Sequence, residues 1–210
     1  MTDLLSLPQA GKYRVIYADP PWPFATWSHI GMSGDGEQKT RGQRSRQAPY
    51  ETLSHKDIAS IQVAELAAEN AVLFLWVVQT QLPKALDLVQ QWGFTFKSVA
   101  FAWFKGNSLP LFPDDAITTI GCGYWTRAGF EQCWLATKGK PSRLHADVRQ
   151  TILEGRREHS RKPDCVYDRI ERLVEGPYLE LFARTTRPGW DSWGNELDKF
   201  APTSAPTSAA

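Results

Sequence analysis

Runs of apolar residues alternate with segments of helical periodicity along most of the chain. The apolar runs are rich in β-branched and aromatic residues, a composition that favours buried strands. The run AVLFLWVV over residues 71–78 has no polar position, as expected for a strand in a sheet that is covered on both faces. The predicted strands cover residues 13–18, 71–78, 94–104, 132–137 and 178–183.

Segments with helical signals lie between these strands. Ser54 and Asp57 resemble a capping box, and Pro83 fits the first turn of a helix that Gly93 ends. The predicted helices cover residues 54–70, 80–93 and 163–174. Because strands alternate with helices, the pattern predicts an α/β fold with a doubly wound, mostly parallel sheet. Such sheets bind their ligands at the carboxyl ends of the strands.

Two segments do not follow this pattern. Residues 25–49 are polar and glycine-rich, which predicts a long mobile loop on the substrate side. Residues 201–210, APTSAPTSAA, contain only small residues and proline, which predicts a disordered tail. The remaining composition, with 42% hydrophobic residues in a chain of 210, predicts a single domain over residues 1–200.

Composition and motif content also argue against several classes of protein. Cys122, Cys133 and Cys165 form no CxxC pair, so we expect neither a zinc site nor a disulfide framework, and no metal. The sequence lacks a G-x-G-x-x-G motif, which weakens a kinase or a dehydrogenase assignment. It shows no signal peptide and no apolar stretch long enough to span a bilayer, so we expect a cytoplasmic protein without membrane contact. The net charge of +1 gives no overall basic field, although segregated charge would still allow nucleic acid to bind.

The first predicted strand ends in the segment VIYADPPW, residues 15–22. Asp19 follows the strand directly, where a ligand would bind. Pro20 and Pro21 have no N–H and a fixed φ, so the backbone there offers only rigid carbonyl acceptors beside a carboxylate. Such a group suits a substrate that presents an NH₂ group, with the ring of Trp22 stacking on its base. The alternative is a proline turn whose Trp22 fills the core and whose Asp19 caps a backbone group.

The amino group of a nucleobase is a poor nucleophile because its lone pair is delocalised into the ring. Two acceptors, one for each N–H, can draw the nitrogen toward tetrahedral geometry and localise that lone pair. Acceptors that are preorganised for the transition state lower the barrier. A base inside a duplex cannot reach such a pocket, so it must be flipped out or already single-stranded.

The ADPPW segment resembles the catalytic motif of amino-methyltransferases, and this form is similar to that of the MT-A70 family of adenine N6-methyltransferases. Four further segments resemble that family in the family's order, and the overall pattern is most similar to its compact bacterial and phage branch. These segments are LFLWV (73–77), GYWTRAGFEQCWLATKGKP (123–141), REHSRKPDCVYDRIERL (157–173) and LELFART…RPGWDSWGNEL (179–197).

This resemblance implies an S-adenosylmethionine-dependent methyltransferase with a Rossmann-like fold. The catalytic motif precedes the cofactor segment, which resembles the circularly permuted β class. By resemblance, Asp19, Pro20, Pro21 and Trp22 form the catalytic loop. The residues implied to bind the cofactor are Lys162, Glu180, Arg184, Thr185, Thr186, Asn195 and Glu196.

The implied substrate is the N6 amino group of adenine, and the bacterial and phage character favours DNA. Basic residues expected to contact phosphates are Lys39, Arg41, Arg44, Arg46, Arg143 and Arg149. Two alternatives stay open: an RNA adenine N6-methyltransferase, and a catalytically silent subunit that only binds nucleic acid. The family resemblance also implies a homodimer or a heterodimer.

Overall fold

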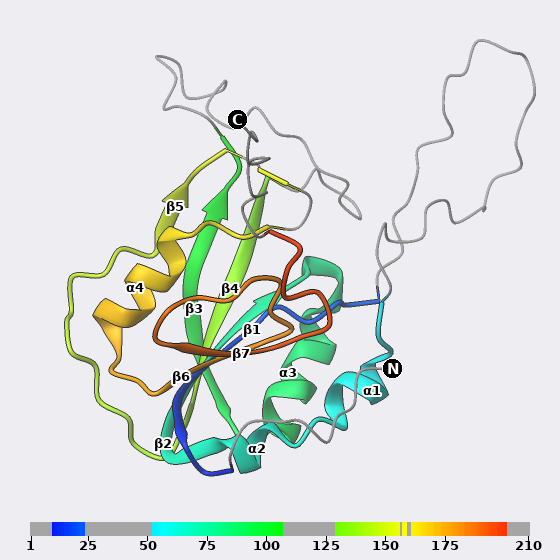
Figure 1. Cartoon of the computed structure of the whole chain (residues 1–210), viewed down its shortest axis with the longest axis vertical. Helices are drawn as coiled ribbons and strands as arrows, with labels where there is room; N and C mark the ends of the chain where they lie inside the picture. The colour runs from blue at the N-terminus through cyan, green and yellow to red at the C-terminus, as the bar shows by residue number, and fades with distance from the viewer. Residues whose placement is uncertain (1–9, 24–51, 107–128, 156, 159–160, 201–210) are drawn as a thin grey trace, which may run out of the picture.

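The computed structural model describes residues 10–23, 52–106, 129–155, 157–158 and 161–200. Within these residues seven strands form one sheet in the order β5-β3-β4-β2-β1-β6-β7 (Figure 1). The strands are β1 (Tyr13–Ala18), β2 (Ala67–Val77), β3 (Thr95–Phe104), β4 (Phe130–Lys138), β5 (Thr151–Leu153), β6 (Tyr178–Leu181) and β7 (Trp190–Trp193). The predicted loop over 25–49 and the predicted tail over 201–210 lie outside the described residues.

The sheet is mostly parallel, as the alternation of strands and helices predicted. Strand β1 pairs in parallel with β2 and with β6, and the pairs β6–β7 and β3–β5 are also parallel. Strand β4 is antiparallel to both of its neighbours, β2 and β3. The α/β class and the Rossmann-like arrangement of the sheet are therefore confirmed.

The chain changes direction across the sheet at β1. It adds β2 on one side of β1 and later adds β6 and β7 on the other side. Ala18, the last residue of β1, pairs with Leu75 of β2 and with Leu181 of β6. The carboxyl ends of β1 and β6 therefore lie side by side at a topological switch point, where open α/β sheets bind their ligands.

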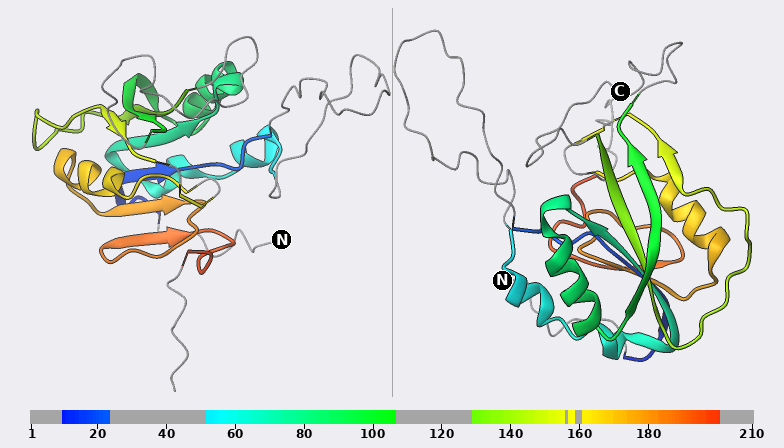
Figure 2. Two further views of the ribbon diagram at one scale, coloured as in Figure 1. Left: turned by 90° about the horizontal axis from the view of Figure 1, so that it is seen from above. Right: turned by 180° about the vertical axis from the view of Figure 1, so that it is seen from behind.

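Helices cover both faces of the sheet (Figures 1 and 2). They are α1 (His55–Ala59), α2 (Val63–Leu66), α3 (Leu82–Gln91) and α4 (Cys165–Leu173), with a 3₁₀-helix η2 (Gln79–Gln81) before α3. Alternate residues of β1 serve the two faces, because successive strand side chains point in opposite directions. Ile16 packs in the cluster with α1, α2 and α3, whereas Val15 and Tyr17 pack in the cluster with α4.

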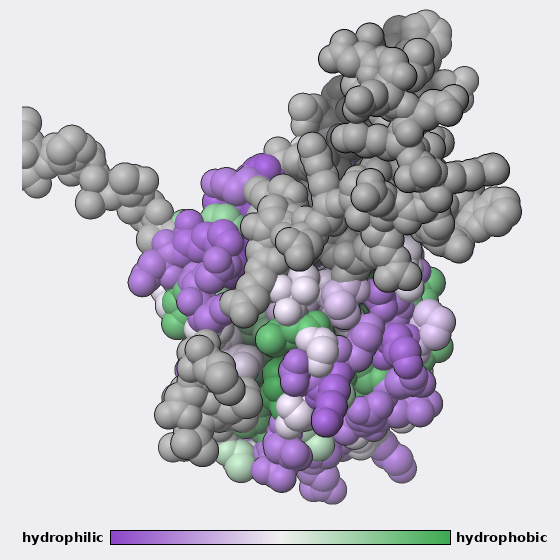
Figure 3. Space-filling model, turned by 90° about the vertical axis from the view of Figure 1, so that its right-hand side faces the viewer, coloured by the Kyte–Doolittle hydropathy of each residue, from purple (hydrophilic) through white to green (hydrophobic). Residues whose placement is uncertain are grey.

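The described surface is largely hydrophilic. Seen from the right-hand side of Figure 1, hydrophilic residues surround a narrow strip of hydrophobic ones (Figure 3). The large apolar residues that are exposed among the described ones are Leu86, Phe130, Leu144 and Leu153. They come from different parts of the chain. Most of the other large apolar side chains that the structure describes lie in the two core clusters.

The predicted helix over 54–70 is wrong in its second half. Ser54 does cap α1, where its Oγ accepts from the N–H of Asp57, but α1 ends at Ala59 and α2 is a single turn. Residues 67–70 belong to β2, and Ala67 pairs with Tyr13 of β1. The long-range ladder therefore overrides the local helical periodicity.

Other differences concern ends and short elements. Thr80 lies in η2, and Gln81 takes the N-cap position of α3 without a side-chain bond. Strand β6 ends at Leu181, two residues before the predicted strand does. Strands β5 and β7 were not predicted: they have three and four residues, too short for a clear periodicity, and pairing with β3 and β6 defines them.

Candidate active site

The DPPW segment leaves the sheet at the switch point, as predicted. Asp19 follows the last residue of β1, and its side chain is 20% exposed. The carbonyl of Pro20 accepts a bond from the N–H of Trp22 at 2.8 Å, and the carbonyl of Pro21 accepts from the N–H of Leu53 at 3.1 Å. These bonds hold the loop in a fixed shape, and each carbonyl oxygen keeps a second lone pair.

Trp22 does not lie where the sequence led us to expect it. The residue is 2% exposed and belongs to the core cluster on the α1–α3 face. Its indole Nε1–H donates to the carbonyl of Trp76 at 2.8 Å, and its ring lies 5.9 Å from that of His55. The expected stacking of Trp22 on a base is therefore wrong for this geometry. A large ring with a polar edge fits the core once its N–H is paired, and here it anchors the DPPW loop.

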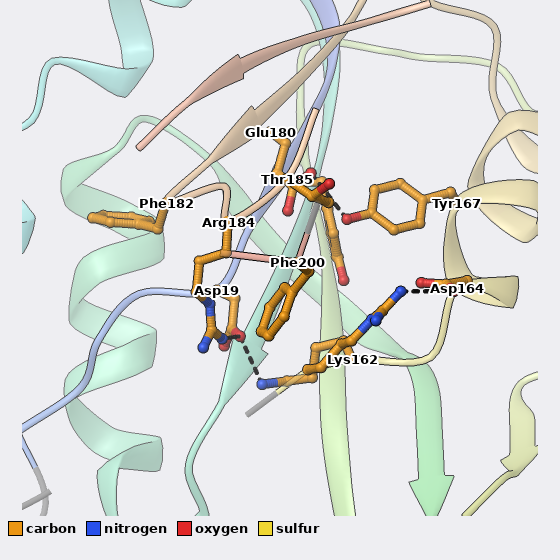
Figure 4. A pocket seen from close by; sticks show the side chains of 11 residues that line it. Asp19, Lys162, Asp164, Tyr167, Glu180, Phe182, Arg184, Thr185 and Phe200 are labelled. Atoms are coloured by element: carbon orange, nitrogen blue, oxygen red, sulfur yellow. Dashed lines mark hydrogen bonds and ion pairs between the residues drawn. The ribbon is translucent and has the colours of Figure 1, made fainter. Parts of the chain in front are cut away.

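Two cations converge on the carboxylate of Asp19. The Nζ of Lys162, just before α4, lies 2.7 Å from Oδ2, and a guanidinium nitrogen of Arg184, just after β6, lies 3.3 Å from the same oxygen (Figure 4). The side chains of Lys162 and Arg184 are 13% and 19% exposed. The structure thus brings together three residues that the sequence assigned to catalysis and to cofactor binding.

Lys162 also faces a second carboxylate, which was not among the predicted site residues. Its Nζ lies 3.5 Å from Oε2 of Glu131 on β4, and Glu131 pairs in turn with Lys105. Burial opposes the charge of Lys162, but Asp19 and Glu131 outweigh it and raise its pKa above the ordinary value. Burial likewise opposes the charge of Glu131, yet Lys162 and Lys105 lower its pKa to about 2. Lys162 and Glu131 therefore both carry their charges at neutral pH.

Glu180 lies deeper in the same site. It is 7% exposed, and its carboxylate accepts a bond from the hydroxyl of Tyr167 on α4 at 2.9 Å. Burial raises the pKa of Glu180 to about 7, although the bond from Tyr167 works in the opposite direction. Tyr167 was not predicted as a site residue, because a tyrosine on an amphipathic helix reads as core. Glu180 was detectable, since it is the one charged residue of an otherwise apolar segment.

These side chains line one pocket (Figure 4). Both acidic and basic groups line it, so it can hold a ligand that carries both signs of charge. Its described lining residues are Tyr17, Asp19, Arg161, Lys162, Asp164, Tyr167, Glu180, Phe182, Arg184, Thr185 and Phe200. The ring of Phe200 lies 5.2 Å from the guanidinium carbon of Arg161 and 5.5 Å from that of Arg184.

The turn after β6 directs Arg184 toward Asp19. Phe182 has a φ of 62°, in the left-handed region that costs a non-glycine residue free energy. Ala183 then bonds to the end of β7, since its N–H donates to the carbonyl of Trp193 at 3.0 Å. Gly194 fits closely behind it: a Cβ there would lie 2.1 Å from the carbonyl oxygen of Ala183. The close approach explains a glycine at this position and fixes the start of the segment that carries Asn195.

The remaining predicted cofactor residues are placed less centrally. Thr185 lines the pocket with Arg184, whereas Thr186, Asn195 and Glu196 are not among its described lining residues. The carboxylate of Glu196 pairs with Lys199 at 2.6 Å. Asn195 and Glu196 follow β7, two strands from β1.

The two predicted phosphate contacts that the structure describes, Arg143 and Arg149, are not among the described residues that line the pocket. Residues 39–46, with Lys39, Arg41, Arg44 and Arg46, lie outside the described residues. Arg143 is exposed in the segment after β4, and because β4 is antiparallel, this segment starts at the opposite edge of the sheet from Asp19. The N–H of the next residue, Leu144, bonds to the carbonyl of Leu173 at the end of α4. Arg149 is exposed just before β5.

Two features are absent from the described residues. These residues contain no group of three or more His, Cys, Asp or Glu side chains that could hold a metal ion. No helix among them is both long enough and apolar enough to cross a membrane.

The switch point between β1 and β6, the DPPW loop and the pocket of mixed charge together define a Rossmann-like methyltransferase of permuted motif order. Comparison with known proteins agrees. The model of the MT-A70 family matches residues 13–196, so the chain belongs to the MT-A70 family. The family and the enzyme class predicted from the sequence are confirmed.

Individual relatives come from bacteria and from eukaryotes. The chain is 33% identical over 194 residues to Type II methyltransferase M.MunI of Mycoplasma sp, which covers 89% of this chain and 78% of that protein. It is 30% identical over 198 residues to the N(6)-adenosine-methyltransferase MT-A70-like protein of Drosophila melanogaster, covering 92% of this chain and 28% of that protein. It is 29% identical over 192 residues to the N(6)-adenosine-methyltransferase catalytic subunit METTL3 of Homo sapiens, covering 90% and 29%.

Proposed function

We propose that this protein transfers the methyl group of S-adenosylmethionine to the N6 amino group of adenine in DNA. The observation that carries the proposal is the position of Asp19 at the switch point, followed by two prolines whose carbonyls point from a fixed loop. DNA is favoured because the chain matches 78% of the length of M.MunI but only 29% of the length of human METTL3. The similarity in extent supports the compact bacterial type.

Asp19 and the Pro20 carbonyl hold the substrate amino group. Each accepts one N–H, which orients the nitrogen and localises its lone pair. Asp19 also stabilises the positive charge that develops on this nitrogen as its bond to the methyl carbon forms. The loop cannot shift to follow the substrate, because Trp22 anchors it in the core. The loop backbone that carries both acceptors is therefore preorganised, and positioning supplies much of the rate.

The pocket residues fit the cofactor chemically. S-adenosylmethionine, when bound, supplies an electrophilic methyl group on a sulfonium and carries a carboxylate, an ammonium and a ribose. Lys162 and Arg184 are part-buried cations that suit the carboxylate. Glu180 is a buried acceptor that suits an ammonium or hydroxyl group. Thr185, which lines the pocket, and Thr186, Asn195 and Glu196, which follow the adjacent strands, complete the proposed cofactor site by resemblance to the family.

RNA is the second candidate substrate. The eukaryotic relatives carry the name N(6)-adenosine-methyltransferase, which favours a ribonucleoside. A silent subunit is less well supported, because the whole segment Asp19–Trp22 is present. The homodimer or heterodimer, the cytoplasmic location and the absence of a metal stay predictions. So do the phosphate contacts of Lys39, Arg41, Arg44, Arg46, Arg143 and Arg149.

The test is methyl transfer from labelled S-adenosylmethionine to duplex DNA, single-stranded DNA and RNA, side by side. We expect label as N6-methyladenine in DNA, lost in Asp19→Ala and kept in Asp147→Asn, a surface carboxylate paired with Arg172. Label in RNA alone would favour the second candidate. No label on any nucleic acid from protein that binds the cofactor would favour the silent subunit.

A further inference from the structure

The carboxylate assigned to the substrate amino group is engaged by other groups. Oδ2 of Asp19 accepts from both Lys162 and Arg184. These two cations line the same pocket as Asp19, and their charged ends point toward the carboxylate of Asp19 (Figure 4). Any anionic group that enters the pocket therefore meets cations that already have a partner.

An incoming carboxylate would have to compete with Asp19 for these cations, because negative groups already surround Lys162. Lys162 faces Asp19 at 2.7 Å and Glu131 at 3.5 Å, so its ammonium already lies between two carboxylates. A third carboxylate can approach Lys162 and Arg184 closely only if Asp19 shares them or moves away. The side chains of Asp19, Lys162 and Arg184 are at most 20% exposed, so water screens the interactions among them less than at the surface.

The same cations oppose the chemical step as long as they stay on Asp19. Positive charge develops on the amino nitrogen during methyl transfer, and Asp19 is placed to stabilise it. Two cations on that carboxylate reduce its field at the substrate. A carboxylate that takes over the cations would restore the field.

We propose that the carboxylate of the cofactor and the carboxylate of Asp19 compete for Lys162 and Arg184, so that cofactor binding frees Asp19 for the adenine amino group. The inference rests on the proposed function and adds an order to it: the cofactor binds before the base. Because coupling between sites is reciprocal, a bound base also strengthens cofactor binding.

The test measures binding of S-adenosylhomocysteine by calorimetry, without any turnover. Asp19→Asn keeps the shape of the side chain and removes its charge, so the side chain no longer competes with the ligand's carboxylate for Lys162 and Arg184. We expect the Kd of S-adenosylhomocysteine to fall about 5-fold or more, in the range typical of coupled sites. The Kd of 5′-methylthioadenosine, which lacks the amino-acid part and its carboxylate, is expected to stay unchanged. In the background of Lys162→Met, the gain in affinity for S-adenosylhomocysteine from Asp19→Asn should be smaller, because one of the two cations for which the carboxylates compete is absent.

Asp147→Asn is the control. Asp147 is a surface carboxylate that pairs with Arg172, so its substitution removes a negative charge without releasing a cation of the pocket. Equal or weaker binding of S-adenosylhomocysteine by Asp19→Asn would overturn the inference, as would an equal gain in Asp147→Asn. Both results leave the proposed function intact. Failure of the unaltered protein to bind S-adenosylhomocysteine would instead contradict the proposed function.

Discussion

The ammonium of Lys162 lies 2.7 Å from the carboxylate of Asp19, although 143 residues separate them in the sequence. The contact exists because β1 and β6 are neighbours and the segment before α4 crosses their carboxyl ends. The two residues come from the two motifs that the sequence assigned to different tasks, catalysis and cofactor binding. Their ion pair couples the catalytic site and the cofactor site electrostatically.

Lys162→Met should weaken the fold as well as the cofactor site. The change leaves the carboxylates of Asp19 and Glu131 without a shared cation, so we expect a loss of about 2 kcal/mol in the free energy of unfolding. Urea denaturation checks this, with Lys12→Met as the control. Lys12 pairs with Asp191 at the surface, and its loss should cost less than about 1 kcal/mol. Equal effects of the two substitutions would count against a buried network around Lys162.

Trp22→Phe tests whether Trp22 anchors the catalytic loop. The change keeps most of the ring but removes the N–H that bonds to the buried carbonyl of Trp76, so we expect a loss of about 1–3 kcal/mol in stability. Trp92→Phe removes a similar buried bond, to the carbonyl of Ile58, away from the loop. Both variants should lose stability, but only Trp22→Phe should also slow methyl transfer by folded protein. Normal transfer by folded Trp22→Phe would show that the anchor is dispensable.

Much of the site could be predicted because its residues stand next to recognisable elements. Asp19 follows an apolar strand, Lys162 precedes a helix and Arg184 ends another strand, so local patterns place each of them at an element boundary. Their proximity required the strand order, which the resemblance to a family suggested and which periodicity cannot provide. Glu131 directly precedes the predicted strand over 132–137, and nothing local says that Lys162 faces it.

The burial of Trp22 could not be derived from the same patterns. An aromatic ring after a strand is equally suited to stack on a base or to fill a core. Only the carbonyl of Trp76, which satisfies its N–H, decides between them. The strand at residues 67–70 was mispredicted for a related reason, since its partner in β1 lies more than fifty residues away in the chain.

Glu180 should give the protein a measurable pH dependence. Its pKa in the folded protein is raised to about 7, above the ordinary 4.5, so the folded state holds a proton that the unfolded state releases. Stability from this group is therefore present below about pH 4.5 and is lost as the pH rises to about 7. Glu180→Gln removes this pH-dependent loss of stability. Urea denaturation across this pH range should show the free energy of unfolding of the variant rising relative to that of the unaltered protein, by up to about 3 kcal/mol.

The dependence of stability on pH below about 4.5 distinguishes the effect of Glu180 from that of Glu131. The pKa of Glu131 is lowered to about 2, so its contribution is lost only as the pH falls below about 4.5 toward 2. A constant difference between Glu180→Gln and the unaltered protein from pH 4.5 to 8 would contradict the raised pKa of Glu180.

Gly194→Ala should disturb the cofactor pocket through the backbone. The new Cβ would lie 2.1 Å from the carbonyl oxygen of Ala183, which directly precedes Arg184. We expect weaker binding of S-adenosylhomocysteine, by about 10-fold, because the turn that positions Arg184 must shift. Gly189→Ala is the control: its φ of +81° strains an alanine, but no atom lies within 4 Å of the added Cβ. Binding that falls equally in both variants would point to general destabilisation.

The most direct test of the account is the single-turnover rate of methyl transfer to adenine by Asp19→Asn with the cofactor site saturated. The account predicts a rate about 10²–10³-fold below that of the unaltered protein, the loss typical of one preorganised electrostatic group, with cofactor binding kept. Asp147→Asn should react at the unaltered rate. A rate for Asp19→Asn within about 3-fold of the unaltered protein would contradict the assignment of Asp19 as the acceptor of the adenine amino group.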